Sequence, residues 1–335
     1  MHSRSRTTID DVAREAKVST ATISRYLNDP DKVAIQTRAV IAATIQRLQY
    51  QPNQAARVLA SNHNTVIGLV VDEIGGEFFS PMLHGIEKAT SQHGYDLLIL
   101  SAHGKAKVGE YPINEHNTAG LVVFANSLPE AELRRLHRIG FPVVLLHRSS
   151  PPDIDIPFVT VANHAGAREM TDYLIEQRGY RRIAFLEGEA GSEDAQTRLQ
   201  GYRDSLEVHG LGFDPLLIGA GGFSEQTAHD TVMQWLRRGL KIEAIFAADD
   251  DSAIGAMSAI TERGLRVPQD IAVVGFDDTR LARYLTPPLT TVRMPIEHAG
   301  RLAVEHLVQV IQTGSTEQRT LLPTELIIRA SCGCC

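Results

Sequence analysis

Residues 19–28, STATISRYLN, gather small hydroxyl side chains around a single arginine. Ser, Thr and Ile are not strong helix formers, so propensity alone would not hold this segment in a helix. If it does form a helix, four side chains share the outward face: Thr20, Ala21, Ser24 and Arg25. Small side chains let a helix enter the major groove of DNA, where hydroxyls reach phosphates and an arginine reaches base edges. The segment therefore predicts a nucleic-acid contact.

An acidic triplet, Asp249–Asp251, follows the apolar run 244–247. Clusters of oxygen ligands can bind hard cations such as Mg²⁺. A more economical interpretation is that one carboxylate faces a ligand and another caps a helix beginning at 251. No metal site is therefore predicted.

Other patterns that could carry catalysis are incomplete. The segment GAGGF, 219–223, lacks the third glycine of a dinucleotide-binding loop and a phosphate-binding lysine, and it is typical of a turn after a strand. The three cysteines all lie in the tail, at Cys332, Cys334 and Cys335, where we expect a disordered end that tolerates thiols. They cannot build a disulfide framework or supply four metal ligands, and no Ser-His-Asp or Cys-His pairing can be argued. We predict neither an enzyme nor a cofactor.

Three helices are expected to position the hydroxyl-rich segment. The first spans 8–16, and the second begins after Ser19 and runs to about Leu27, with Ile23 and Leu27 facing inward. Two short helices joined by a tight break form a helix-turn-helix. A third helix, 36–50, would complete the core with Val40, Ile41, Ile45 and Leu48.

From about residue 64 the pattern changes to short apolar runs that alternate with amphipathic stretches. The runs are continuous, as expected for parallel strands buried on both faces. Several of the intervening stretches end at a glycine, which is typical of a helix C-terminus. This alternation predicts a doubly wound parallel α/β body, and about 270 residues favour two subdomains. The predicted strands are 65–71, 95–100, 120–124, 142–146, 159–162, 182–186, 216–219, 244–247, 271–276 and 325–330, and 101–120 is expected to be a loop or a degraded helix.

Charge is unevenly distributed along the chain. The net charge is −7, yet residues 1–62 hold nine Lys and Arg against five Asp and Glu. A small basic head on an acidic body favours a nucleic-acid contact confined to the head. No apolar run approaches the roughly 20 residues that span a bilayer, and no secretory signal is visible, so we expect a cytoplasmic protein without a membrane partner.

The head resembles the LacI/GalR family of bacterial transcriptional repressors. The resemblance is carried by TIDDVAREAKVSTATISRYLN and by Tyr50, Pro52, Asn53, Arg57 and Leu59 in the following segment. It continues through the body in FFSPMLHGIEKATSQHGYDLLI, RLQGYRDSL, ADDDSAIGAM, VPQDIAVVGFDD and PPLTTVRMP. It is weakest at 101–120 and in the tail.

The resemblance implies a repressor that binds a pseudo-palindromic DNA operator as a homodimer. Thr20, Ala21 and Arg25 would face base edges, and Leu59 would wedge into the minor groove and kink it. The remaining residues implied to contact DNA are Ser19, Thr22, Ser24, Asn28, Thr37, Asn53 and Arg57.

The resemblance also implies a periplasmic-binding-protein-like body that closes on a small effector. The implied effector residues are Phe78, Phe79, His147, Arg148, Arg198, Phe223, Asp249 and Asp277. Carboxylates and arginine suit the hydroxyls of a sugar, and aromatic faces suit its C–H side. Two alternatives stay open: Phe78 and Phe79 as core residues, and Arg198 as a solvated surface residue.

The resulting architecture has three parts. Residues 1–50 form the helix-turn-helix head, 51–62 a hinge helix and linker, and 63–335 the effector-binding and dimerisation domain. Its N-subdomain covers about 63–162 plus 293–324, and its C-subdomain about 163–292 plus 325–331. A sugar-binding solute receptor without DNA function is the alternative. The sequence leaves open the identity of the effector and whether it acts as an inducer or a corepressor. It also leaves open the operator, the target genes, whether the protein forms a dimer or a tetramer, and any role for the cysteine tail.

Overall fold

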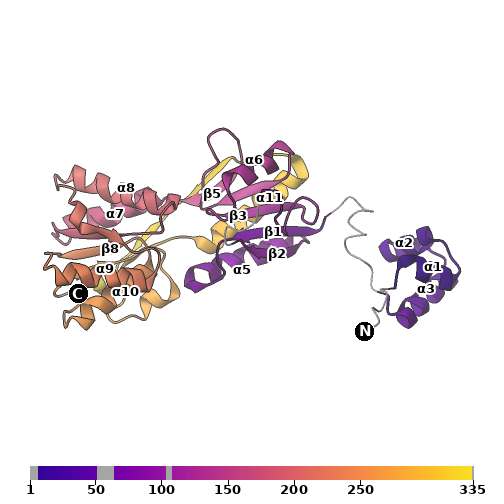
Figure 1. Ribbon diagram of the computed structural model, residues 1–335, viewed down its shortest axis with the longest axis horizontal. Coiled ribbons are helices and arrows are strands. Elements are labelled where there is room, and N and C mark those ends of the chain that lie inside the picture. Colours follow the sequence, from indigo (N-terminus) through magenta and orange to yellow (C-terminus); the bar gives the residue numbers. More distant parts are fainter. Residues whose placement is uncertain (1–6, 51–63, 103–107, 334–335) are drawn as a thin grey trace. The chain divides into compact units, whose positions relative to one another are not determined.

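The chain divides into two compact units, Met1–Asn64 and Thr65–Cys335. The structure, a computed structural model (Figure 1), describes residues 7–50, 64–102 and 108–333. The predicted hinge therefore lies outside the described residues, as do Cys334 and Cys335. Within the described ranges, no helix is long and apolar enough to cross a membrane.

The first unit is the predicted three-helix head. Its helices are α1 (Ile9–Ala16), α2 (Thr20–Asn28) and α3 (Ile35–Leu48). Thr8 and Asp11 form a capping box at the start of α1, in which each side chain accepts a bond from the other residue's backbone N–H. Lys17 adopts a left-handed conformation that ends α1 and turns the chain toward α2. The helix-turn-helix is confirmed.

The head has a small apolar core made of Val12, Ala13, Ala16, Ile23, Val33 and Ile41. The prediction that Val40 belongs to this core is wrong, because its side chain is 49% exposed. Successive residues of a helix point about 100° apart, so only one of Val40 and Ile41 can face the core. Thr44, one turn after Ile41, is buried instead, and its Oγ1 donates to the Val40 carbonyl at 2.9 Å.

The first lobe of the body is built on a six-stranded parallel sheet in the order β11-β5-β4-β3-β1-β2. The strands are β1 (Val66–Val71), β2 (Asp96–Ser101), β3 (Gly120–Phe124), β4 (Val143–Leu146), β5 (Phe158–Val161) and β11 (Arg319–Leu322). Its first five strands follow the doubly wound order 2-1-3-4-5, in which ligands bind at the carboxyl ends of the strands. The described part of the predicted loop, 108–119, contains no helix.

Helices cover both faces of this sheet. One face packs against α5 (Gly76–Gln92) and α11 (Ile296–Thr313), and the other against α6 (Glu130–Arg138) and the loop 108–119. The contact between α5 and α11 depends on Gly85 and Gly300. A Cβ on Gly85 would overlap the carbonyl oxygen of Glu297, and one on Gly300 would lie 2.6 Å from the Met82 carbonyl oxygen.

Strand β2 departs from the predicted pattern of full burial. Leu98 is 41% exposed and Ile99 is 38% exposed. An apolar run predicts a strand but does not reveal whether that strand is central or at the edge of its sheet. Here β2 is an edge strand, so part of its apolar surface faces solvent.

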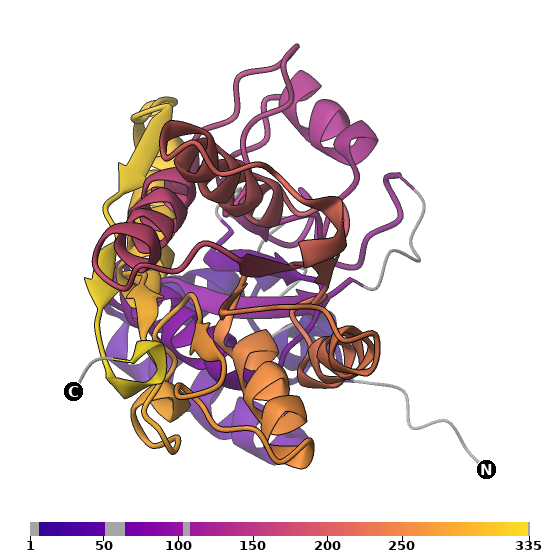
Figure 2. The same cartoon turned by 90° about the vertical axis from the view of Figure 1, so that its left-hand side faces the viewer.

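The second lobe holds a four-stranded parallel sheet in the order β7-β6-β8-β9, formed by β6 (Ile183–Glu187), β7 (Ile218–Ala220), β8 (Ala244–Ala247) and β9 (Ala272–Val274). Helices α7 (Asn163–Glu176) and α8 (Glu193–Val208) cover one face. Helices α9 (Glu225–Arg237) and α10 (Asp250–Glu262) cover the other. The predicted α/β body of two doubly wound subdomains is confirmed, and Figures 1 and 2 show its two helix-covered sheets.

The chain crosses between the lobes three times: after β5, before α11 and after β11. A short antiparallel pair, β10 (Thr291–Arg293) with β12 (Glu325–Ile327), lies beside the second and third crossings. The apolar run 325–330 was expected to form a parallel strand, and this is wrong. Only Glu325–Ile327 of this run form a strand, and the returning direction of the chain makes its pairing with β10 antiparallel.

The C-terminal segment is also different from the expected disordered end. Cys332 is fully buried in the core of the second lobe. Its carbonyl oxygen accepts bonds from Arg178 Nε at 3.1 Å and from the Tyr180 hydroxyl at 3.2 Å, and the Ser331 hydroxyl donates to the Val273 carbonyl at 2.6 Å. A buried thiol behaves as a small apolar side chain, so Cys332 is part of the folded core.

Candidate functional site

The predicted DNA-contacting face of α2 points to solvent. Ile23 is fully buried in one cluster with the core residues of α1 and α3, which fixes the helix despite its weak propensity. Thr20, Ala21 and Arg25 are exposed on the other side, and Ser24 is partly buried. Packing thus holds α2 from one side and leaves a row of small side chains with one long cation on the other.

The N-termini of two helices add groups suited to phosphate. Ser19 Oγ accepts from the Thr22 N–H at 3.2 Å and so caps α2, and it lies 2.8 Å from Thr22 Oγ1. Helix α3 begins at Ile35 without a side-chain cap, and Thr37 lies partly buried in its first turn. Uncapped N–H groups at a helix start bind phosphate oxygens.

The remaining predicted DNA residues carry no side-chain description. Asn28 is the last residue of α2, and nothing is described of its side chain. Asn53, Arg57 and Leu59 lie outside the described residues. Their roles stay predictions.

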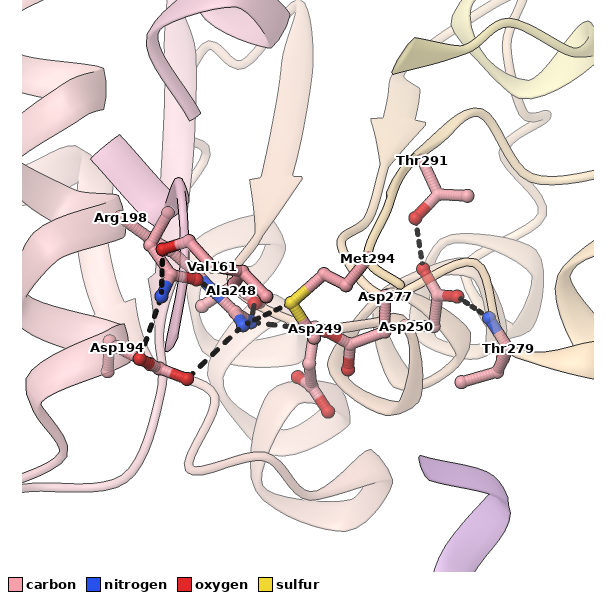
Figure 3. Close-up of polar contacts among 12 residues, drawn as sticks. Val161, Asp194, Arg198, Ala248, Asp249, Asp250, Asp277, Thr279, Thr291 and Met294 are labelled. Carbon is pink, nitrogen blue, oxygen red and sulfur yellow. Dashed lines mark hydrogen bonds and ion pairs between the residues drawn. The ribbon is translucent and has the colours of Figure 1, made fainter. Parts of the chain in front are cut away.

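In the body, several predicted effector residues converge on one buried guanidinium (Figure 3). Arg198 of α8 is 2% exposed, so the alternative of a solvated surface arginine is wrong. Its Nε donates to Asn163 Oδ1 at 2.8 Å, and its Nη1 donates to the Ala248 carbonyl at 2.5 Å. Nη1 also lies 3.3 Å from Asp277 Oδ1, and Nη2 lies 3.3 Å from the Met294 sulfur. Arg198 therefore organises groups from several elements of the second lobe and its crossings.

Aromatic rings flank the same guanidinium. Arg198 Cζ lies 3.9 Å from the centroid of the Phe276 ring and 6.0 Å from that of Phe223. Phe223 has a φ of 53° and follows Gly222, whose φ is 66°. These left-handed conformations form the turn predicted at 219–223 after β7, and the turn brings the Phe223 ring to Arg198.

Two carboxylates face this cluster from neighbouring strand ends. Burial raises the pKa of Asp277 well above its usual range, although the nearby Arg198 acts to lower it. Burial likewise raises the pKa of Asp249 to about 6. Asp249 also caps α10, since its Oδ1 accepts from the Ser252 N–H at 3.2 Å. The helix therefore begins at Asp250 and not at 251, and the cap is the same carboxylate that was expected to face a ligand.

Asp250 has a structural role behind the site. Its carboxylate accepts from the Thr291 hydroxyl at 2.6 Å and from the Thr279 N–H at 2.7 Å. Complete burial raises the pKa of Asp250 to about 7. Asp278 braces the same loop, because its oxygens accept from Arg293 at 2.8 Å and from Arg329 at 2.5 Å.

A buried pair connects the two lobes. His147 follows β4 in the first lobe, and its Nδ1 lies 2.6 Å from Asp194 Oδ2 in α8 of the second. Burial acts to raise the pKa of the Asp194 carboxyl, but the charge and hydrogen bond of His147, with Arg198, lower it below its ordinary value. The ionised carboxylate accepts, so Nδ1 donates. The other ring nitrogen, Nε2, is buried and has no partner among the described residues.

An aromatic wall completes the first-lobe side. Ring centroids lie 5.5 Å apart for Phe78 and Phe79, 5.3 Å for Phe79 and Phe124, and 5.8 Å for Phe78 and His147. Both phenylalanines are partly buried. Phe79 packs on the first-lobe core, whereas Phe78 packs against the core cluster of the second lobe. Phe78 therefore spans the boundary between the lobes.

A cavity of about 800 Å³ adjoins this cluster and shares Phe78, Asp277 and Met294 with it. Its volume is in the range of small-molecule sites. Across its opening, Arg280 of the second lobe pairs with Glu77 of the first at 3.4 Å.

Arg148 is the predicted effector residue that does not join the others. Its Nη1 donates to the Leu128 carbonyl at 2.9 Å, and its Nη2 lies 3.7 Å from Glu130 at the start of α6. Burial lowers the pKa of this guanidinium. A long side chain after a strand end can turn either way, and this one turns toward α6.

Side chains of the cluster that were not predicted as effector residues include Asn163, Phe124, Asp194, Phe276 and Met294. Asp194 had a signal, because it precedes Arg198 by four residues on the same helix and so shares its face. Asn163 opens α7 at the first crossing between the lobes. Within the described residues, no group of three His, Cys, Asp or Glu side chains could hold a metal ion.

Comparisons with known proteins agree with both units. Residues 8–53 match the family described as bacterial regulatory proteins, lacI family, and residues 171–332 match the periplasmic binding protein-like domain. The HTH-type transcriptional regulator CelR of Thermobifida fusca is 32% identical over 341 residues, which cover 99% of this chain and 100% of that protein.

Two solved structures are similar over nearly the whole chain. A complex of the transcriptional regulator CelR with cellobiose has a TM-score of 0.72 and 30% identity, covering 97% of this chain and 100% of that one. A lac repressor dimer bound to operator and the anti-inducer ONPF has a TM-score of 0.82 and 28% identity, covering 98% and 99%. With its helix-turn-helix head and two-lobed body, the chain belongs to the lacI family of bacterial regulatory proteins.

Proposed function

We propose that the protein is a sequence-specific DNA-binding transcriptional repressor whose operator affinity is controlled by a sugar or sugar derivative bound between the lobes. The observation that carries the proposal is α2, which buries Ile23 and exposes Thr20, Ala21 and Arg25. Such a helix can enter the major groove without losing its own packing. The protein would act in the cytoplasm, where bacterial DNA lies.

The head would divide its contacts between bases and phosphates. Thr20, Ala21 and Arg25 would reach base edges, and the long, exposed guanidinium suits the O6 and N7 acceptors of guanine. Hydroxyls and helix N-termini would fix the position of the head on the phosphates; these groups are Ser19, Thr22, Ser24, Asn28 and Thr37. From the hinge, Leu59 would insert into the minor groove, with Asn53 and Arg57 beside it.

A homodimer would match a two-fold operator. Exposed apolar side chains on both lobes support this state: Leu98 and Ile99 on edge strand β2, and Leu281 and Tyr284 in the second lobe. Tyr284 is 70% exposed. The lac repressor of similar fold is a dimer on its operator.

The effector would connect the lobes and thereby change the geometry presented to DNA. The cluster around Arg198, with carboxylates on one side and aromatic rings on the other, suits hydroxyls and the C–H face of a sugar ring. A ligand that favours one arrangement of the lobes shifts the population toward that arrangement, which would either raise or lower the affinity for the operator.

Selection from random DNA followed by footprinting tests the DNA half of the proposal. We expect enrichment of a pseudo-palindrome with two half-sites, bound by the dimer. If no sequence is enriched at moderate salt, the protein is not a sequence-specific repressor. A thermal-shift screen of sugars, repeated in the presence of the selected operator, then identifies the effector and the sign of its effect.

A further inference from the structure

The turn between α2 and α3 connects the two parts of the head that would contact DNA. The Asp29 N–H ends α2 by donating to the Arg25 carbonyl at 2.8 Å. A short 3-10 helix, Pro30–Lys32, follows, and α3 begins at Ile35. Residues 29–34 therefore determine where the start of α3 lies relative to the exposed face of α2.

Backbone N–H groups at the start of α3 are free to bind a ligand. Those of Ile35, Gln36 and Thr37 have no acceptor among the described residues. The first backbone bond of the helix runs from the Arg38 N–H to the Ala34 carbonyl at 2.9 Å. Such a group of N–H donors suits a phosphate oxygen, provided that the preceding turn holds the helix start against the DNA backbone.

One side chain of α3, that of Arg38, fastens this turn. Its Nε donates to the Val33 carbonyl at 2.6 Å, and its Nη2 donates to the Asp31 carbonyl at 2.9 Å. Its Nη1 donates to the Asp31 carboxylate at 2.7 Å. The guanidinium is a planar fork, so donors from all three nitrogen atoms hold two carbonyls and one carboxylate in a single geometry. Arg38 is thus committed to the turn.

The backbone bonds of the turn do not connect it to α3. They run from the Lys32 N–H to the Asp29 carbonyl and from the Val33 N–H to the Pro30 carbonyl, both at 3.1 Å. Val33 is also buried in the core of the head. The burial of Val33 and the three bonds of Arg38 therefore tie the turn to the helix that follows it.

The same arginine also neutralises a carboxylate. The side chain of Asp31 is 92% exposed, and its Oδ1 pairs with Arg38 Nη1. An unpaired carboxylate beside phosphates would repel them. Loss of Arg38 would therefore act both through the position of the turn and through charge, and the two effects need separate variants.

We infer that Arg38 is a positioning residue for DNA binding. Its bonds to the carbonyls of Asp31 and Val33 hold the free N–H groups at the start of α3 where they bind a phosphate of the operator. Arg38 itself does not contact DNA. This inference rests on the proposed function, since it names the side chain that positions one of the phosphate contacts of the head.

The test uses the full-length protein and the operator selected with the wild type. Affinity is measured by fluorescence anisotropy, and the contacted phosphates are mapped by ethylation interference. Arg38→Gln should bind the operator roughly 10-fold more weakly, the effect of losing about one hydrogen bond to a charged group. Interference should disappear at one phosphate of each half-site and persist at the others.

The salt dependence of binding separates positioning from direct contact. Backbone N–H groups release no counterions, so the slope of log affinity against log salt should be the same for Arg38→Gln and the wild type. A direct contact of Arg38 with a phosphate would instead reduce the slope by about one per head. That reduction would overturn the inference.

Asp31→Asn separates position from charge. This variant keeps both backbone carbonyls that Arg38 binds, so it should bind the operator as the wild type does. Combined with Arg38→Gln, it restores the net charge of the head, and the loss of affinity should persist. Recovery of wild-type affinity in the double variant would show that Arg38 acts only by neutralising Asp31.

Arg47→Gln is the matched control on the same helix. It removes the same charge but breaks an exposed pair with Glu15 of α1, at 2.8 Å, and should leave the interference pattern unchanged. If Arg47→Gln loses as much affinity as Arg38→Gln, a general loss of charge or of helix stability explains both, and the positioning role is refuted.

Arg38→Lys covers the case in which Arg38→Gln does not fold, as judged by circular dichroism. Lysine keeps the charge but lacks the fork that reaches both carbonyls, so this variant should bind more weakly than the wild type and lose the same interference signal. Wild-type affinity in Arg38→Lys would show that the fork is not needed.

The outcomes also separate this inference from the proposed function. If the wild type selects an operator and Arg38→Gln binds it equally well, the positioning role alone fails. If the wild type enriches no operator, the repressor function fails, and the positioning role fails with it.

Discussion

His147 of the first lobe and Asp194 of the second meet through Nδ1 and Oδ2 at 2.6 Å, and both are largely buried. A chemically matched pair joins α7 to the same helix α8, where His164 Nε2 and Asp204 Oδ2 are 2.7 Å apart. Both members of that second pair belong to the second lobe, and their side chains are 40% and 36% exposed. The two pairs differ in burial and in whether they join the lobes.

This difference predicts unequal effects of the same substitution. Asp194→Ala removes the acceptor of His147 and of Asn163, and should destabilise the body by about 1–3 kcal/mol for the buried donors left without a partner. It should also increase the radius of gyration measured by small-angle scattering. Asp204→Ala removes an exposed pair and should destabilise the body less than Asp194→Ala, with no change in size. Equal effects of the two variants would show that the buried pair does not hold the lobes together.

Asp250 predicts a pH dependence of stability. The pKa of this carboxyl is raised to about 7 in the folded protein from an ordinary value of 3.8. The folded state keeps a proton that the unfolded state has released, so the stability that Asp250 contributes is complete below pH about 4 and is lost as the pH rises toward about 7. Asp250→Asn can still form hydrogen bonds with Thr279 and Thr291, and it does not lose this stability as the pH rises. Melting temperatures from pH 4 to 8 should therefore shift in favour of the variant as the pH rises.

Asp270 supplies a control of opposite sign. A hydrogen bond from Arg266 lowers the pKa of this exposed carboxyl. Its contribution is present above the ordinary Asp range and is lost in acid. The melting temperature of Asp270→Asn should therefore fall relative to that of the wild type as the pH rises from acid. Parallel curves for wild type and Asp250→Asn would contradict the assignment of Asp250.

Arg198 and Asp277 should be strongly coupled. Arg198→Met removes the guanidinium that donates to Asn163, Ala248 and Asp277, and should destabilise the body by about 1–3 kcal/mol for the buried acceptors left without a partner. Asp277→Asn should cost less in this background than in the wild type, with a coupling of about 0.5–3 kcal/mol. Urea denaturation of the two single variants and the double variant measures it. Strictly additive losses would mean that the 3.3 Å contact contributes no coupling.

Arg25→Ala tests the DNA-contacting face. If this guanidinium contacts a guanine, the variant should lose about 1–3 kcal/mol of affinity for the selected operator and bind nonspecific DNA almost as before. Arg14→Ala is the matched control, since Arg14 is also an exposed arginine of the head but lies on α1. Equal loss of specificity in both variants would indicate a purely electrostatic role for Arg25.

The sequence predicts local structure better than it predicts contacts between distant parts of the chain. The head helices and the alternation of strands and helices follow from patterns within a few residues, and they agree with the structure. Position within a sheet depends on distant segments, so the exposure of Ile99 on edge strand β2 and the antiparallel pairing of β12 were not predicted. The burial of Cys332 depends on Arg178 and Tyr180, which lie more than 150 residues away in the chain.

The same distinction applies to the effector cluster. Asp249 and Asp277 lie within three residues of a strand end and have short side chains whose direction is set by the backbone, and the structure brings them together with Arg198. Arg148 also follows a strand, but its flexible side chain takes acceptors near α6. Asp194 belongs to the cluster because it shares a helix face with Arg198, a relation that depends on the helix and not on the residue type.

The separation of roles along α2 has a consequence for retargeting. Ile23 carries the packing of this helix, and the neighbouring positions Thr20, Ala21 and Arg25 are exposed. Substitutions at exposed positions usually change stability by less than about 0.5 kcal/mol. The three positions can therefore be randomised together to select variants with new DNA specificity on an unchanged fold. The DNA specificity of the head could then be exchanged without altering the body that would bind the ligand.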